Sequence, residues 1–191
     1  MLVDSFKRKI EYLRVSVTDR CDLRCSYCMV EDMKFLPRQE VLSIEELIKL
    51  IEMFNKLGVV KYRLTGGEPL VRKGIVDIIE YLNTLKLKGL IKEHTLTTNG
   101  TNLIKYSKIL KKNGVERINV SLDTLRASRF KEITRWGDVN KVLNGIQAAL
   151  DEGIKVKINT VVTKDFNDDE LIEIINWSEK KSVDVSLIEV M

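Results

Sequence analysis

The sequence predicts an α/β protein whose six βα units form a partial barrel. Strand-like and helix-like segments alternate along the chain at intervals of about 30 residues, which is the size of one βα unit. Strict alternation of this kind indicates a parallel sheet with right-handed crossovers. Several strands also alternate polar and apolar residues, whereas strands of an open doubly wound sheet are apolar on both faces. A curved (βα)6 partial TIM-type barrel, whose polar faces line a wet interior, fits this pattern better than a flat sheet.

The strands are recognised as short runs with one apolar face. In order along the chain they are expected at 12–18, 59–65, 92–98, 117–123, 155–162 and 183–190. The first of them shows the pattern clearly, because Arg14, Ser16 and Thr18 alternate with apolar residues. The fifth repeats it and places Lys157 on the polar face.

Apolar residues at helical spacing predict the helices between the strands. They are expected at 44–57, 73–87, 103–112, 138–151 and 168–181. Ser43 and Glu46 fit a capping box at the start of the first helix, and Gly58 suits the position after its end. An Asn167/Asp168 cap is expected at the start of the last helix. The stretch 124–137 is expected to be less regular.

The composition is typical of one globular domain. With 191 residues, the chain is long enough to build a full core. No run of about 18 apolar residues predicts a membrane span, and the first residues lack the apolar stretch of an export signal. Free thiols without an export signal indicate the cytoplasm. The formal net charge of +4 is modest and scattered, so the sequence does not predict nucleic-acid binding.

The three cysteines of the chain all fall within eight residues, as Cys21-x-x-x-Cys25-x-x-Cys28. Three thiolates this close can bind three irons of a cubane cluster and leave the fourth iron open for chemistry. The polar residues between them argue against burial of all three in the core, and the odd count argues against a disulfide framework. Structural zinc needs four ligands, and His94 is far away in sequence. An iron–sulfur site is therefore favoured, with zinc, redox and core roles as alternatives.

Unusual residues follow several strands at the ends where parallel βα folds place their chemistry. Besides the cysteines, they are Gly66-Gly67-Glu68-Pro69, Thr97-Thr98-Asn99-Gly100 and Ser121-x-Asp123. Each of these segments alone predicts little more than a turn. Because the C-terminal ends of parallel strands share one edge, the loops are expected to converge on one mouth.

Cys-x-x-x-Cys-x-Tyr-Cys after a first strand and Gly-Gly-Glu-Pro after a second resemble the radical S-adenosylmethionine (SAM) enzymes. The wider sequence is similar to the MoaA family, the GTP 3′,8-cyclases of the first step of molybdenum cofactor biosynthesis. The similarity runs over essentially the whole chain, with its main segments at 4–6, 13–21, 63–72, 97–100, 119–123 and 157–162. The resemblance implies the same partial barrel.

The resemblance implies a [4Fe–4S] cluster on Cys21, Cys25 and Cys28, with SAM bound to the open iron. One electron from the cluster would cleave SAM to a 5′-deoxyadenosyl radical. In the family this radical takes hydrogen from C3′ of GTP, and C3′ then bonds to C8, giving (8S)-3′,8-cyclo-7,8-dihydroguanosine 5′-triphosphate. The cofactor supplies this chemistry, and the protein supplies positioning and water exclusion. No catalytic side chain beyond the cluster is identified.

The resemblance also assigns ligand contacts to individual residues. Those expected to contact SAM are Tyr27, Gly67, Ser121 and Met191. Those expected to contact GTP are Arg14, Arg63, Thr97 and Lys157. Gly67 suits SAM because a residue without Cβ lets the ligand approach the backbone closely. For Arg14 and Lys157 there is also a physical argument, since a cation buried on a polar strand face is costly unless an anion accompanies it. Asp123 or Glu68 inside the barrel would be the alternative partners.

Two departures from the family pattern concern the C-terminal part of the chain. The family has a C-terminal extension whose further cysteines bind a second [4Fe–4S] cluster, and this chain has no cysteine left for it. Residues 1–191 are therefore expected to form a single radical SAM core domain without the second-cluster domain, as a fragment of a longer enzyme. Ser186 stands where the family usually has an arginine that binds substrate.

The expected function is that of a radical SAM lyase core of the GTP 3′,8-cyclase type. The alternatives are a radical SAM enzyme with a different substrate, and a catalytically incomplete fragment that binds SAM or a nucleotide. The expected partners are GTP, a reducing electron donor and, in the pathway, the downstream cyclic pyranopterin monophosphate synthase MoaC. A homodimer is compatible with the sequence, whereas no nucleic-acid or membrane partner is expected.

Overall fold

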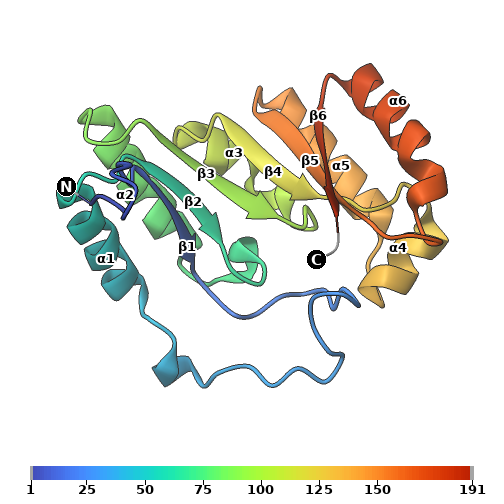
Figure 1. The fold of residues 1–191 in the computed structure, drawn as a ribbon, viewed down its shortest axis with the longest axis horizontal. Helices are drawn as coiled ribbons and strands as arrows, with labels where there is room; N and C mark the ends of the chain where they lie inside the picture. The colour runs from blue at the N-terminus through green and yellow to red at the C-terminus, as the bar shows by residue number, and fades with distance from the viewer. Residues whose placement is uncertain (1, 190–191) are drawn as a thin grey trace.

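The computed structural model describes residues 2–189, and these residues form a sheet of six parallel strands. The strands are β1 (Tyr12–Ser16), β2 (Lys61–Thr65), β3 (Glu93–Thr98), β4 (Arg117–Ser121), β5 (Lys155–Val162) and β6 (Asp184–Glu189). They lie side by side in chain order, each paired in parallel with the next (Figure 1). Parallel pairing in chain order, with crossovers of one hand, puts the connecting helices on one face of the sheet.

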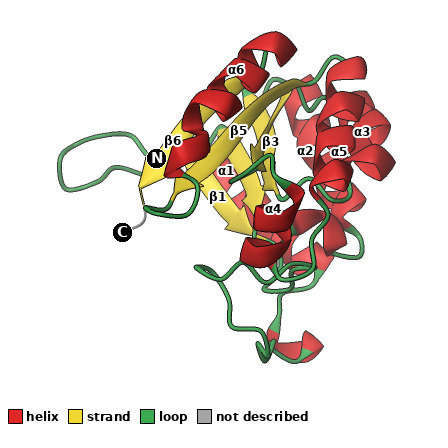
Figure 2. Ribbon diagram, turned by 90° about the vertical axis from the view of Figure 1, so that its right-hand side faces the viewer, coloured by secondary structure: helices red, strands yellow, loops and turns green. Residues whose placement is uncertain are grey.

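The helices cover that one face. They are α1 (Ile44–Lys56), α2 (Ile75–Leu87), α3 (Leu103–Lys112), α4 (Ala127–Thr134), α5 (Val139–Asp151) and α6 (Leu171–Lys181). Figure 2 shows α2, α3 and α5 stacked together on one side of the yellow strands. Short 3-10 turns occur at Arg38–Glu40, Pro69–Val71 and Asp168–Glu170. The expected (βα)6 partial TIM-type barrel is therefore confirmed.

The hydrophobic core lies between the strands and this helix layer. The strands contribute Leu64, Leu96, Ile118 and Ile158, each at most 1 % exposed. Buried apolar side chains of α1, α2, α3, α5 and α6 complete the same cluster from the other side. Burial of this apolar surface is the main favourable contribution to folding.

The opposite, inner face of the sheet carries the polar residues of the strands. In the parallel register Arg14 lies next to Arg63, and Thr97, Asn119 and Lys157 form a row across β3, β4 and β5. These positions alternate with the apolar ones that pack on the helices, as the sequence pattern predicts. The interior of the partial barrel is therefore polar.

Capping residues set the ends of α1. The Ser43 hydroxyl oxygen accepts the Glu46 N–H at 3.1 Å, and the Glu46 carboxylate accepts the Ser43 N–H at 2.7 Å. The expected capping box is thus confirmed. Gly58 follows the helix with a φ of 102°, a left-handed conformation that favours glycine.

The stretch 124–137, expected to be less regular, contains the short helix α4, which the sequence did not predict. The helix has only eight residues, and its buried face consists of Phe130, Ile133 and Thr134. A segment this short and this polar shows too few apolar repeats for its period to be read from sequence.

The start of the last helix also differs from the expectation. Helix α6 begins at Leu171 after a 3-10 turn, and Asn167 does not cap it. The Asn167 side chain instead accepts the Thr163 N–H and donates to the carbonyl oxygens of Asp123 and Val161. The side chain thus joins the ends of β4 and β5, which is a tertiary role that local sequence does not reveal.

Several strands are shorter than expected, since β1 ends at Ser16 and β4 ends at Ser121. Position 190 of the expected sixth strand lies outside the described residues. Within residues 2–189, no helix has the length and apolar character needed to cross a bilayer.

Gly145 allows α5 to pass close to the turn after β3. A Cβ at this position would lie 2.6 Å from the Gly100 carbonyl oxygen and 2.9 Å from Leu103 Cβ. We predict that Gly145→Ala lowers the free energy of unfolding by about 1–2 kcal/mol, because backbone crowding outweighs a gain of roughly 1 kcal/mol in helix propensity. Urea unfolding measures the change. Asn144→Ala compared with Asn144→Gly, at an exposed position of the same helix, reports the propensity effect alone. A Gly145→Ala protein as stable as the parent would contradict the prediction.

Candidate functional site

The expected site residues meet at the C-terminal edge of the sheet. The loop after β1 carries the cysteines, and the loop after β2 carries the Gly-Gly-Glu-Pro segment. Two backbone hydrogen bonds of 2.8 Å join these loops, from Gly67 N–H to the Thr18 carbonyl and from Glu68 N–H to the Arg20 carbonyl. The pairing of β1 with β2 is thereby continued beyond the strands, and the predicted convergence of these loops is confirmed.

Glu68 lies at the centre of this convergence, and its side chain is fully buried. One carboxylate oxygen accepts the Leu70 N–H at 2.9 Å and the Thr98 hydroxyl at 2.8 Å, and the other accepts the Asn99 N–H at 2.6 Å. Burial raises the pKa of Glu68 to about 7, and the three donors oppose that shift. The carboxylate therefore joins the loops after β2 and β3 in one fixed arrangement.

Close backbone packing explains why two glycines precede Glu68. A Cβ on Gly67 would lie 2.3 Å from the carbonyl oxygen of Arg20, and one on Gly66 would lie 2.3 Å from that of Thr18. The group that approaches them closely is the start of the cysteine loop. This explains both glycines without a ligand, so the contact of Gly67 with SAM stays a prediction.

The cysteine loop presents three free thiols. Cys21 and Cys25 are half-buried and Cys28 is exposed. The Cys21 sulfur accepts hydrogen bonds from the Leu23 N–H at 3.4 Å and from the Asn99 side-chain amide at 3.7 Å. Among residues 2–189, no three His, Cys, Asp or Glu side chains gather closely enough to hold a single metal ion.

The donor chemistry of this loop fits an iron–sulfur cluster. Thiolates are the usual ligands of such clusters, and hydrogen bonds to their sulfurs tune the reduction potential. Burial raises the pKa of Cys25 to about 12, with a further contribution from the Asp123 charge, and burial raises the pKa of Cys21 as well. These thiols stay protonated at neutral pH unless a positively charged metal centre stabilises the thiolates. Cluster binding by Cys21, Cys25 and Cys28 stays a prediction.

Asp22 fastens the cysteine loop to the residues after β3. Its carboxylate accepts the Asn99 amide at 2.7 Å and the Thr101 hydroxyl at 2.6 Å. Its backbone carbonyl accepts the indole N–H of Trp136 at 2.8 Å. Cys21 thus lies between two residues that are held in place. Arg20 accepts the Glu68 N–H through its carbonyl, and Asp22 accepts the three hydrogen bonds given above. The sequence did not indicate this network, because Asn99-Gly100 in isolation predicts only a turn.

Helix α4 supports the other side of the cysteine loop. The Ser26 N–H donates to the Ile133 carbonyl at 2.9 Å, and the Arg24 N–H donates to the Thr134 carbonyl at 3.3 Å. The Arg24 guanidinium also donates to the Cys21 carbonyl at 2.8 Å. The helix missing from the sequence-based prediction is therefore one of the elements that position the thiols.

Tyr27 connects the cysteine loop to the ends of β4 and β5. Its hydroxyl donates to one carboxylate oxygen of Asp123 at 2.8 Å, and the other oxygen accepts the Val161 N–H at 2.8 Å. Asp123 is 5 % exposed, and burial raises its pKa. Ser121 is half-buried on β4, close to Asp123 in the chain. Tyr27 and Ser121 thus reach the same mouth, whereas Met191 lies outside the described residues.

The residues expected to contact GTP share the inner face of the sheet. Arg14 and Arg63 are neighbours in register, and the Arg63 guanidinium lies 5.8 Å from the ring centre of Tyr12. Thr97 and Lys157 are half-buried in the neighbouring row. The Arg63 Nε is buried and has no hydrogen-bond partner among residues 2–189. The contacts of all four with GTP stay predictions.

Arg14 is not buried, contrary to the expectation from the polar face of its strand. Arg14 is exposed, so it carries no burial cost that an anion would have to offset. The alternative carboxylate partners are also engaged elsewhere, Asp123 with Tyr27 and Glu68 with its loop donors. The argument still applies to Lys157, which is half-buried. It applies also to Arg63, whose buried Nε has no hydrogen-bond partner among residues 2–189.

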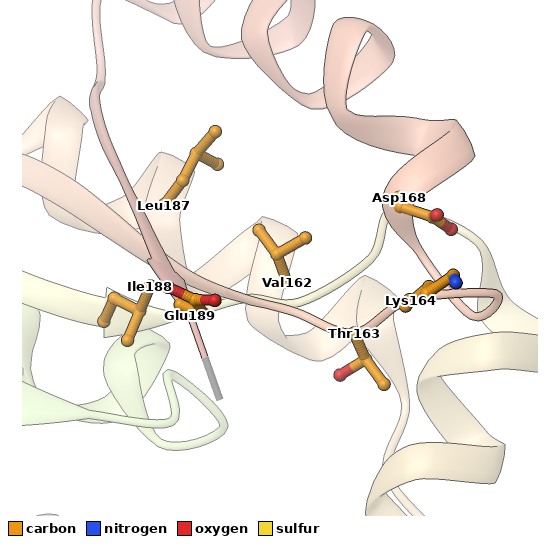
Figure 3. Close-up of a pocket in the computed structure, with 7 residues that line it drawn as sticks. All are labelled: Val162, Thr163, Lys164, Asp168, Leu187, Ile188 and Glu189. Atoms are coloured by element: carbon orange, nitrogen blue, oxygen red, sulfur yellow. The ribbon is translucent and has the colours of Figure 1, made fainter. Parts of the chain in front are cut away.

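A hollow of about 650 Å³ opens beside the ends of β5 and β6 (Figure 3). Thr163, Lys164 and Asp168 line it from the loop after β5, and Leu187 and Ile188 line it from β6. Among residues 2–189, none of those expected to contact the cluster, SAM or GTP is among its lining residues. Within this described part of the chain, the candidate site is therefore defined by the converging loops.

Comparison with known proteins defines the class of the protein. Residues 15–178 match the family model of the radical SAM superfamily. The chain therefore belongs to the radical SAM superfamily, a group of enzymes whose cofactors are a [4Fe–4S] cluster and SAM.

Within that class, the chain is similar to curated proteins named GTP 3′,8-cyclase. It is 54% identical to the Nitrobacter winogradskyi protein and 55% identical to the Brucella ovis protein, over 190 residues in each case. Both matches cover 100% of this chain and 55% of the relative, so the chain spans about half the length of the curated relatives it matches.

Solved structures share the fold. Streptococcus suis SuiB bound to S-adenosylmethionine aligns with a TM-score of 0.75 and 20% identity, over 95% of this chain and 39% of that chain. HydG, a maturase of the [FeFe]-hydrogenase, aligns with a TM-score of 0.71 and 20% identity, over 93% and 42%.

Glu68→Gln keeps the size of the side chain but replaces one acceptor oxygen with a donor. We predict a loss of about 2 kcal/mol in the free energy of unfolding, because an amide group would then face a backbone or hydroxyl donor without an acceptor. Urea unfolding of the cluster-free chain measures it. Glu80→Gln, at an exposed position of α2, is the matched control and should leave the stability unchanged. Equal stability of both variants would show that the Glu68 carboxylate does not hold the loops together.

Proposed function

We propose that this chain is the radical SAM core of a GTP 3′,8-cyclase and that residues 1–191 form one core domain. Superfamily membership and 54% identity to a curated cyclase over the whole chain support the proposal. The observation that carries it is the packing of the cysteine loop against the loops after β2 and β3, organised by Glu68 and Asn99.

In this proposal Cys21, Cys25 and Cys28 hold a [4Fe–4S] cluster with one open iron. When bound, the cluster supplies the electron that cleaves the carbon–sulfur bond of SAM. The chain positions the ligands: Asp22 and α4 hold the loop backbone, and N–H groups of Leu23 and Asn99 are directed at the Cys21 sulfur. Hydrogen bonds of this kind stabilise negative charge on sulfur and so favour the reduced cluster.

The same proposal places SAM at the mouth of the barrel. Tyr27, Gly67 and Ser121 would contact it, together with Met191 from the family pattern. The hydrogen bond from Tyr27 to Asp123 fixes the ring at the mouth, and Ser121 projects from the end of β4. The residues around SAM would exclude water from the reacting bond, and this exclusion is what the protein contributes to radical chemistry.

GTP, the substrate proposed for the whole enzyme, would lie on the inner face below the mouth. Arg14, Arg63 and Lys157 supply positive charge for a triphosphate, and Thr97 supplies a hydroxyl. The unpartnered Nε of Arg63 would gain an acceptor on binding.

The remaining expectations belong to the same proposal and rest on the likeness to the cyclases. They are the production of (8S)-3′,8-cyclo-7,8-dihydroguanosine 5′-triphosphate in the cytoplasm, its use by MoaC in molybdenum cofactor biosynthesis, a reducing electron donor, and a homodimer.

Anaerobic reconstitution of the chain with iron and sulfide tests the cluster. We predict about four irons per chain and an electron paramagnetic resonance signal of the reduced protein that changes when SAM is added. Cys28→Ala should lose the cluster, because two cysteines remain, whereas Ser26→Ala, an exposed neighbour in the same loop, should keep it. The proposal would be contradicted if the electron paramagnetic resonance signal of the parent protein does not change when SAM is added. It would also be contradicted if the parent forms no 5′-deoxyadenosine with dithionite.

Arg63→Ala tests the substrate assignment on the reconstituted protein. We predict that GTP binds about tenfold more weakly, which corresponds to about 1.4 kcal/mol, while the iron content stays unchanged. Isothermal titration calorimetry measures the affinity. Lys141→Ala, at an exposed position of α5 in the helix layer, should bind GTP like the parent. If the parent protein has an intact cluster but does not bind GTP, the result would contradict the GTP assignment. It would favour a radical SAM enzyme that acts on another substrate.

A further inference from the structure

A second hollow, of about 500 Å³, lies beside the beginning of the cysteine loop and has a cationic lining. Arg20, Arg38, Arg72 and Lys73 line it, and no carboxylate does. The four cations come from three segments, namely the loop after β1, the turn before α1 and the turn before α2. The fold therefore gathers positive charge here from distant parts of the sequence.

The four cations of this hollow have no carboxylate partner in the described part of the chain. Arg72 donates through Nη2 to the Leu42 carbonyl at 2.7 Å, while its Nε is buried without a partner. Asp19, which precedes Arg20, accepts the Leu36 N–H at 2.7 Å through Oδ2, while its buried Oδ1 has no partner among the described residues. Four clustered like charges repel one another, so a negatively charged partner would be bound favourably.

The starts of two helices border the cationic hollow. Ser43 and Ile44, at the start of α1, line the cationic hollow, as does Gly74 at the start of α2. The N-terminal end of a helix carries a partial positive charge, but acidic side chains in the first turns offset it here, Glu45 and Glu46 in α1 and Asp77 in α2. The positive charge of the hollow therefore comes from its four cationic side chains. Gly74 offers no side chain to cap α2.

A short packed path connects the cationic hollow to the first cysteine. Arg20, in its lining, directly precedes Cys21 in the chain. The Phe35 ring contacts two guanidinium groups, with its centre 5.6 Å from that of Arg20 and 4.8 Å from that of Arg24. Arg24 in turn donates to the Cys21 carbonyl at 2.8 Å. A redox group docked on the hollow would therefore be close to a cluster held by this loop.

We propose that the cationic hollow is the docking site of a small acidic redox protein that donates one electron to the cluster. The donor loses one electron, the cluster gains it, and no bond is made or broken in this step. The inference rests on the proposed function, because only a cluster that is reduced in each turnover needs such a donor. Arg20, Arg38 and Lys73 are exposed, which suits a partner that covers a surface better than a small enclosed anion.

The experiment compares a protein donor with a chemical one. The double variant Arg38→Glu/Lys73→Glu reverses two exposed charges outside the proposed cluster, SAM and GTP contacts. Bacterial flavodoxin, kept reduced by its NADPH-dependent reductase, is the protein probe, and dithionite is the chemical reductant. We expect the variant to form 5′-deoxyadenosine about tenfold or more slowly with flavodoxin, and at the parent rate with dithionite. The flavodoxin rate of the parent should also fall with added salt.

A binding measurement gives an independent readout. Flavodoxin should bind the cluster-free parent chain at low ionic strength, and the double variant should bind about tenfold or more weakly. Lys108→Glu/Lys112→Glu on α3 makes the same charge change at exposed positions of the helix layer and serves as the matched control. This control should behave like the parent in both assays.

The outcomes separate the two proposals. A parent chain that fails to cleave SAM with dithionite would count against the proposed function itself. If the parent cleaves SAM with dithionite, but flavodoxin neither binds nor reduces it, the docking site is overturned. Equal flavodoxin rates for the parent and the Arg38→Glu/Lys73→Glu variant would overturn it as well.

Discussion

The arrangement of the site depends on one buried carboxylate. Glu68 is fully enclosed, and its side chain accepts three hydrogen bonds while its own N–H donates to the Arg20 carbonyl. It thereby connects the loops that follow β1, β2 and β3. A buried carboxylate is stable only when donors satisfy it, so the loops cannot move apart without leaving that group unpaired. The cost of separating them is what keeps the cysteine loop, which has little secondary structure of its own, in a defined position.

Two further connections extend this constraint to the thiols. The Asn99 side chain is held by its backbone bond to Glu68 and by Asp22, and it reaches the Cys21 sulfur. On the far side, Tyr27 is tied to Asp123 at the end of β4. The loop is therefore fixed at both ends of the cysteine motif by side chains from other strands. Such support matters because a ligand set that is misplaced by a fraction of an ångström cannot bind all irons of a rigid cluster equally well.

The sequence was sufficient where the physical signal is local or periodic. Ser43 and Glu46 predict the start of α1, and strand alternation predicts a polar interior, because each depends on neighbours in the chain. Tertiary contacts were not predictable in this way. Trp136 is 50% exposed and yet bonds to Asp22, and α4 matters through its contacts more than through its own propensity. The exposure of Arg14 illustrates the same limit, since Arg14 lies on β1, an edge strand of the sheet, and the pattern of one strand does not reveal its place in the sheet.

Positive charge occurs on two sides of the cysteine loop, and the two groups differ in their surroundings. On the inner face, Arg63 is partly buried with an unpartnered Nε, which suits a substrate that enters and is enclosed. In the cationic hollow, Arg38 and Lys73 are exposed at the starts of α1 and α2, which suits a partner that docks and leaves. Radical chemistry requires that the substrate and SAM close the mouth against water. An electron that arrives while the mouth is closed needs another route, and Phe35 contacts both Arg20 of the cationic hollow and Arg24 of the cysteine loop.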